Sequence, residues 1–208
     1  LNCQSLEELD ISNFNLTSIK SFAYMFNSCK FLFSLNLPNL TQLSVINLSH
    51  MFSGCLSLLS LNLSNFDTSK VLYMDNMFSY CKFLSSLDLD NFNTQSVIDM
   101  KFMFAGCSSL ENLNLSSFNT TSVKFMNGMF YACYKLKLLD LSNFNFDLTE
   151  NMAFMFYQAK SISSLYIPNF KASFVERMHF MFYGCESLIS LNLSNFNTKK
   201  IKKMDALF

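Results

Sequence analysis

The sequence predicts an α/β solenoid in which eight strand–turn–helix repeats stack on one another, with a parallel sheet on the inner face. Met-Phe recurs every 26 residues from Met25-Phe26 to Met181-Phe182, the series ends at Leu207-Phe208, and eight such periods span all 208 residues. The cysteines keep the same step, and Ala159 fills the one slot without a thiol. A fixed period of roughly 20–50 residues is the signature of stacked repeats. The seven cysteines are Cys3, Cys29, Cys55, Cys81, Cys107, Cys133 and Cys185.

Two different local patterns lie within each repeat. Residues 61–63 read Leu-Asn-Leu, which is the alternation of a half-buried strand. Apolar side chains then recur at the spacing of one helix face, at Val71, Met74, Met77 and Phe78. Each repeat is therefore expected to hold a short strand, a turn, and a short helix that returns to the next strand.

Polar residues and glycines mark the ends of the expected helix. Asp67, Thr68 and Ser69 are residue types that cap helix N-termini, and Gly54 stands where a helix C-cap would fall. Helices are about 10 Å wide, whereas strands lie about 5 Å apart. The array is therefore expected to curve with its sheet on the inside.

Equivalent residues must stack when repeats stack, which predicts columns of like side chains. Two aromatic spines account for 15 of the 25 phenylalanines. An asparagine column is expected to satisfy backbone groups left unpaired at the strand-to-turn corner. The first spine is Phe14, Leu40, Phe66, Phe92, Phe118, Phe144, Phe170 and Phe196; the second is Phe26, Phe52, Phe78, Phe104, Phe130, Phe156, Phe182 and Phe208; the asparagines are Asn13, Asn39, Asn65, Asn91, Asn143, Asn169 and Asn195.

The repeat resembles a known family. LxxLxL followed by a turn is the core of a leucine-rich repeat. The fuller pattern in residues 87–107 (LDLDNFNTQSVIDMKFMFAGC) and 113–133 (LNLSSFNTTSVKFMNGMFYAC) resembles the BspA-like leucine-rich repeats, in their 26-residue form rich in Met-Phe and Cys. This resemblance covers the whole chain. It implies a surface or extracellular protein with an adhesion or binding role, and it brings no catalytic motif.

Length and composition narrow the classes of function. We expect residues 1–208 to form a single leucine-rich-repeat solenoid domain of a longer chain, because neither end carries the polar capping repeat that solenoids need. The chain has 15 basic and 15 acidic residues, and this neutral balance argues against a nucleic-acid partner. No apolar run approaches the roughly 18 residues of a transmembrane segment. No cofactor is expected.

The reactive side chains do not suggest an enzyme or a metal site. The seven cysteines share one phase and are odd in number, so we expect reduced, buried thiols, with partial oxidation as the alternative. No C-x-x-C pair indicates zinc, and the methionines at helical spacing are expected in the core. The histidines, His50 and His179, lie 129 residues apart and share no pattern with a nucleophile. We therefore expect no catalytic and no metal-binding residues.

The inner face of the sheet is the favoured binding surface. The column between the two strand leucines carries amide or carboxylate side chains in seven of the eight repeats, flanked by serines. Such a column is consistent with a solvated sheet, or with a surface for a glycan or an extended peptide. The candidate ligand-binding residues are Asp10, Asn36, Asn62, Asp88, Asn114, Asp140 and Asn192.

An aromatic strip on the helix side is the alternative partner surface. Tyr131, Tyr157 and Tyr183 share one column there. They would either pack between neighbouring helices or meet a protein partner. The favoured function is thus a non-enzymatic binding or adhesion module. The alternative is a structural subunit of a fibre, matrix or coat, in which copies of the chain associate by stacking.

Overall fold

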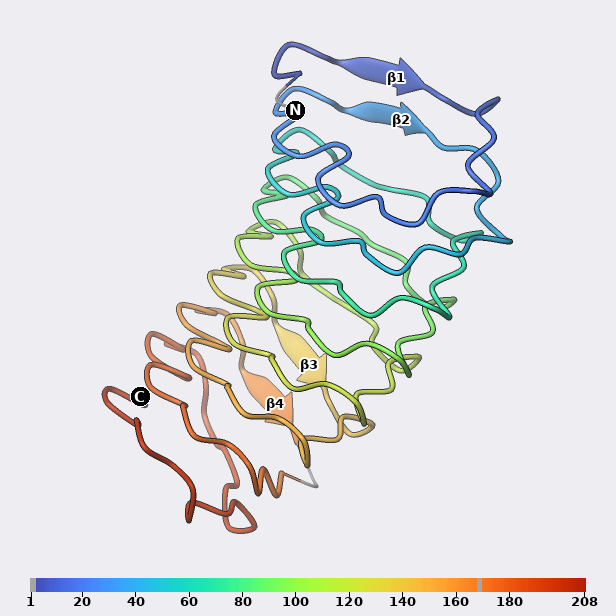
Figure 1. Ribbon diagram of the computed structural model, residues 1–208. Coiled ribbons are helices and arrows are strands. Elements are labelled where there is room, and N and C mark those ends of the chain that lie inside the picture. Colours follow the sequence, from blue (N-terminus) through green and yellow to red (C-terminus); the bar gives the residue numbers. More distant parts are fainter. Residues whose placement is uncertain (1–2, 168–169) are drawn as a thin grey trace.

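The computed structural model describes residues 3–167 and 170–208 as one stack of coils, each coil being one 26-residue repeat counted from residue 1 (Figure 1). Four short strands are regular: β1 (Glu8–Asp10), β2 (Ser34–Asn36), β3 (Leu138–Asp140) and β4 (Ser164–Tyr166). β1 pairs with β2 and β3 with β4, both in parallel. The predicted solenoid with parallel strands is confirmed.

The strands lie in register by one repeat, so equivalent residues are direct neighbours. Leu9 pairs with Leu35, and Leu139 pairs with Leu165. In β3 the central Leu139 is buried and the residues on either side of it are exposed. We call the surface formed by residues 8–10 and their equivalents the strand face. Its leucines point into the core, and its polar side chains point outward.

The predicted helices do not form, and this part of the prediction is wrong. Among the described residues the segments expected to be helical, such as 71–78, are successive turns. Their amide groups alternate between two kinds of partner. Met74, Asn76 and Phe78 donate to the next coil, with N–O distances of 3.0, 2.9 and 2.9 Å, while Met77 donates back to the carbonyl of Met74 at 3.2 Å. A helix would direct all of these groups along its own axis.

The left-handed backbone conformation recurs at fixed points of these turns. Asn76 and Tyr80 have φ angles of 56° and 57°, and their equivalents in the neighbouring coils share this sign. A helix cannot contain such residues in its interior. Parallel bridges such as Tyr73 to Asp99 then connect the coils in a second ladder. We call this surface, residues 71–80 and their equivalents, the turn face.

The predicted cause of curvature is therefore absent. On the turn face neighbouring coils are separated by one ladder spacing, about 5 Å, because backbone hydrogen bonds join them there in place of wide helices. The core confirms this spacing. Phe52 stacks on Phe26 at 5.5 Å between ring centroids and on Phe78 at 5.8 Å. The second predicted spine continues in the same way to Phe208.

Polar side chains pin the corners between the two faces. The buried Thr68 hydroxyl donates to the carbonyl of Asn93 at 3.0 Å and accepts its amide at 2.8 Å. The predicted asparagine column satisfies backbone groups in part: Asn143 Nδ2 donates to the carbonyls of Leu115 and Phe118 at 3.0 and 2.6 Å, and Asn91 Nδ2 donates to the carbonyl of Ser64 at 2.7 Å. Asn169 of this column lies outside the described residues. The side chain of Thr68 thus bridges two coils and does not cap a helix.

Most of the cysteines are buried free thiols, as predicted. Cys107 Sγ donates to the carbonyl of Phe78 at 3.2 Å, and the other buried thiols from Cys55 onward repeat this contact. Burial raises the pKa of Cys107 to about 12. The prediction of complete burial is wrong for Cys3, which is exposed, and Cys185 is only partly buried.

A glycine substitution distinguishes turns from helices by the sign of its effect. Gly128 lies in the middle of a segment predicted to be helical, where alanine would add about 1 kcal/mol of stability. In the structure Gly128 has a φ of 64°, and the ring of Phe102 occupies the space of an added Cβ. We expect Gly128→Ala to lower the free energy of unfolding, measured in urea, by more than about 1 kcal/mol. Asn76→Gly, at the same place in another coil, should be neutral or slightly stabilising; a stabilising Gly128→Ala would contradict the turns.

The buried thiols predict a loss of stability in alkali. The pKa of Cys107 is about 12 when folded, raised from an ordinary value of 9.0, so its contribution is complete below pH 9 and is lost between pH 9 and 12. Compared with Cys107→Ala, which copies the natural Ala159, the native chain should lose about 1.4 kcal/mol more unfolding free energy per pH unit above 9. Urea unfolding at pH 8 to 10.5 measures both proteins. Parallel pH curves would show that Cys107 ionises as easily in the folded chain as in the unfolded one.

Candidate functional site

The strand face brings all seven predicted binding residues into one exposed column. Asp10 pairs with Asn36 across β1 and β2, and the other members follow at the same place in their coils. Where the strands pair, as β1 does with β2, neighbouring members are separated by one ladder spacing, about 4.8 Å. In coil seven the column carries Tyr166, whose Cα pairs with that of Asp140. The exposed members are Asp10, Asn36, Asn62, Asp88, Asn114, Asp140 and Asn192.

Six of these seven side chains also have a structural task, which explains why most coils place Asn or Asp here. One side-chain oxygen accepts the amide hydrogen of the residue two positions later, which closes an Asx turn at the end of the strand. Asn36 is the exception, because residue 38 is a proline and has no amide hydrogen. The N–O distance is 2.8 Å from Ser12 to Asp10, 3.1 Å from Ser64 to Asn62, and 2.9 Å from Ser194 to Asn192. Asp and Asn are interchangeable in this turn. Sequence reasoning missed this role.

The rest of each side chain is left outside the turn. An aspartate retains its second carboxylate oxygen, and an asparagine retains an amide nitrogen with two donors. Some of these groups meet across coils: Asn36 Nδ2 lies 3.3 Å from Asp10 Oδ2. Hydrogen bonds from Ser12 and Asn36 lower the pKa of Asp10, so this carboxylate is ionised at neutral pH. The column therefore displays both hydrogen-bond donors and acceptors.

Shallow hollows accompany the column along the strand face. One of about 280 Å³ lies beside Asn36 and Asn62, and one of about 130 Å³ lies beside Asn114 and Asp140. A third, of about 380 Å³, is lined by serines and by Asp88. A partner could thus insert small groups between coils while it contacts the column.

The tyrosine strip is a stack whose ring faces are already used. Tyr157 stacks on Tyr131 at 4.9 Å and on Tyr183 at 5.4 Å between ring centroids. Phe154 and Phe180 stack beside them at 5.2 Å. Packing between coils therefore takes the place of the expected packing between helices. Both faces of Tyr157 are therefore covered, whereas Tyr131 and Tyr183, at the ends of the strip, each stack through one face.

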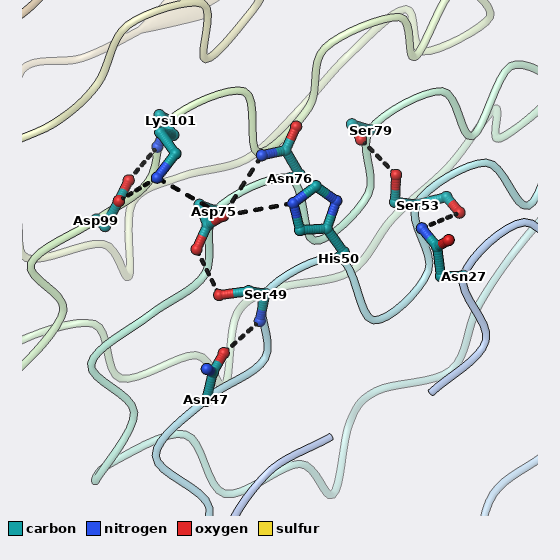
Figure 2. A network of polar contacts seen from close by, with 10 residues as sticks. All are labelled: Asn27, Asn47, Ser49, His50, Ser53, Asp75, Asn76, Ser79, Asp99 and Lys101. Atoms are coloured by element: carbon teal, nitrogen blue, oxygen red, sulfur yellow. Dashed lines mark hydrogen bonds and ion pairs between the residues drawn. The ribbon is translucent and has the colours of Figure 1, made fainter. Parts of the chain in front are cut away.

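A polar network on the turn face was not predicted (Figure 2). Asp75, nearly buried, accepts a hydrogen bond from the Ser49 hydroxyl and lies 3.6 Å from His50 Nε2 and 3.8 Å from Lys101 Nζ. Lys101 also pairs with Asp99 at 2.7 Å. In the sequence, Ser49, Asp75 and Lys101 occupy the same position in three successive repeats, and this could have indicated the network. The network ties coils two, three and four together.

The geometry of this network does not activate a nucleophile. A serine nucleophile would need to donate its proton to an imidazole, whereas Ser49 donates to Asp75. His50 stacks on Tyr24 at 4.6 Å, and burial lowers its pKa even though Asp75 acts in the opposite direction. His179 belongs to coil seven and packs edge-on against Phe154. The two histidines are not brought together.

Neither a metal site nor a membrane-spanning helix has a candidate within the described ranges. In residues 3–167 and 170–208, no three His, Cys, Asp or Glu side chains are grouped so that they could hold a metal ion. In the same part of the chain, no helix has the length and apolar character needed to cross a membrane. The methionines with the lowest exposure, such as Met77 and Met103, are packed in the core.

Four exposed apolar side chains in coils two to four were also missed. Phe31, Phe33, Leu59 and Phe83 lie just before the strand face. In coils five to seven the same columns carry charged or small residues, and there Lys137 pairs with Glu111 at 2.7 Å, whereas in coil eight Ile189 is again exposed. In the sequence, these apolar residues stand at repeat positions that are mostly polar elsewhere, and this difference could have revealed them. Clustered apolar exposure of this kind is typical of an interaction surface.

Comparison with known structures defines the class of protein as a leucine-rich-repeat solenoid. A leucine-rich repeat protein from T. pallidum is 21% identical and superposes with a TM-score of 0.56, over 89% of this chain and 72% of the other. One from Bacteroides ovatus is 17% identical over 98% and 61% of the chains, with a TM-score of 0.41. A TLR13–ssRNA13 complex is 20% identical over 92% and 33%, with a TM-score of 0.35. The T. pallidum protein supports the shared fold.

The family is shown by the sequence. The model described as "Mycoplasma protein of unknown function, DUF285" matches residues 1–87, 46–166 and 135–208, and these overlapping segments cover the chain from end to end. The chain belongs to this family. No curated protein sequence matches it.

Proposed function

We propose that this solenoid is a non-enzymatic binding module and that its strand face receives a protein or glycan partner. The observation that carries the proposal is the exposed Asn/Asp column. Asn62 and Asn192 each use one oxygen for their own turn and keep an outward amide nitrogen beside a hollow. The exposed apolar side chains before the column, such as Leu59, add area for a partner.

The energetics favour a partner that contacts several coils. One hydrogen bond contributes only about 1 kcal/mol net, so a single coil binds weakly. A rigid frame that repeats the same group every ~5 Å lets weak contacts add through effective concentration. Because the column is only lightly charged, binding should depend modestly on salt. An extended peptide or a glycan chain fits these requirements.

An adhesion role and a location at the cell surface or outside the cell form the narrower part of the proposal. Their support is the resemblance of segments such as residues 87–107 to the BspA-like repeats. The absence of an enzymatic role is proposed because Ser49 is bonded to Asp75 and not to His50. Self-association into a fibre or coat is the competing function.

The proposal is tested by probing arrays of glycans and of matrix proteins with the purified chain, a double variant and a triple variant. Asn62→Asp with Asn192→Asp keeps the Asx turns but replaces two outward amides with carboxylates. We expect unchanged thermal stability and at least about a tenfold loss of affinity, since each lost contact contributes about 1 kcal/mol.

The matched control changes the other surface without unstacking it. Tyr131→Phe, Tyr157→Phe and Tyr183→Phe keep the stacked rings and remove their hydroxyls, so we expect no loss of affinity. If the tyrosine control abolishes binding while the strand-face variant retains it, the strand face is not the site. If the chain binds nothing on either array and sediments as filaments, the structural-subunit function replaces the binding function.

A further inference from the structure

The strand-face column has one exception, at Tyr166. Seven coils place an Asn or Asp there, whereas coil seven places a tyrosine at the end of β4. Its Cα pairs with that of Asp140, so the backbone keeps the register of the column. The backbone register is kept, but the side chain that closes an Asx turn in six other coils is replaced by a phenol. A phenol ring stands where every other coil shows an amide or a carboxylate.

The ring is open to solvent and lies beside a hollow. Tyr166 is 57% exposed, and within the described residues no other aromatic side chain stacks on it. The hollow beside it has a volume of about 290 Å³ and is lined by Leu165, Ile167, Phe170 and Asn192 as well as Tyr166. This sets it apart from the tyrosine strip, where Tyr157 is covered on both faces. A flat apolar ring next to a hollow can receive a ligand on its face.

The neighbouring coils supply a hydrogen-bond acceptor and a donor. Asp140 uses one carboxylate oxygen to accept the amide of Ser142 at 2.8 Å, which leaves its second oxygen outside the turn. Asn192 uses its oxygen to accept the amide of Ser194 at 2.9 Å, which leaves its amide nitrogen. Tyr166 thus stands between a carboxylate acceptor in coil six, with which its backbone pairs directly, and an amide donor in coil eight.

This combination fits one class of ligand. A pyranose ring has an apolar face of C–H groups that packs on an aromatic ring, and its rim carries hydroxyls that both donate and accept hydrogen bonds. A carboxylate takes two hydroxyl donors well, and an amide nitrogen donates to a hydroxyl or ring oxygen. Neither requirement involves net charge, in agreement with the neutral chain. The other coils have the polar groups but not the ring.

We propose that Tyr166, with Asp140 and Asn192, forms a carbohydrate subsite in which a sugar ring stacks on the phenol ring. This inference rests on the proposed strand-face binding function and narrows its partner to a glycan. The subsite anchors one sugar residue, and the hydrogen-bonding column toward Asn114 receives the units that follow. The spacing of the sugar units along a glycan needs to match the spacing of the column only over the first few contacts.

The test uses Tyr166→Asn, which restores the amide found in other coils and should leave the fold unchanged. The probes are chitohexaose, cellohexaose, maltohexaose and mannohexaose, and the readout is the change in backbone amide shifts of the labelled full chain. We expect at least one probe to shift the signals of Tyr166 and Asn192. Tyr166→Asn should weaken its affinity about tenfold, the upper range for one aromatic contact.

Two further variants make the result specific. Tyr166→Phe keeps the ring and should retain affinity within about threefold, whereas Asp140→Asn keeps the turn and should weaken binding by removing an acceptor. The inference is overturned if none of the four sugars binds, or if Tyr166→Asn binds them as well as the native chain does. If a matrix protein binds the strand face and Tyr166→Asn leaves its affinity unchanged, the glycan subsite is wrong while the proposed binding function stands.

Discussion

The structure depends on one interaction: the backbone hydrogen bonds that join each coil to the next on the turn face of the solenoid. There the amides of Leu48, His50 and Phe52 donate to the carbonyls of Tyr73, Asp75 and Met77, each at 2.9 Å. On the strand face β1 pairs with β2 and β3 pairs with β4, with the same offset of one repeat. Because the ladder of the turn face runs through all eight coils, equivalent residues come into direct contact along the stack.

That contact explains the composition. A column of phenylalanines can stack at 5.5–5.9 Å only if every coil supplies one at the same place. The same condition places a small, weakly polar thiol at Cys107, where it fills a gap and donates to a carbonyl of the preceding coil. Each Asx turn lets its coil change direction without leaving an amide unpaired. The outward halves of these Asn and Asp side chains then become a regular surface.

The repeat, the parallel strands, the phenylalanine spine and the exposed Asn/Asp column could be predicted from the sequence, because each follows from periodicity alone. The helices could not be distinguished from turns. Spacings of three and four residues between Val71, Met74 and Phe78 also bury one side of successive turns, and only the left-handed backbone at Asn76 separates the two. The Asp75 network escaped prediction because its members come from three repeats. Such contacts depend on departures from the consensus that periodicity does not reveal.

The hydrogen-bond pattern of the turn face can be tested most directly by NMR, through scalar couplings across backbone hydrogen bonds in the deuterated chain. It identifies the carbonyl that accepts each amide hydrogen. The account predicts a coupling from the amide of Asn76 to the carbonyl of Lys101, and from Phe78 to Met103, both in the next coil. Couplings to the carbonyls four residues earlier, Leu72 and Met74, would show helices on this face and would contradict the hydrogen bonds between coils.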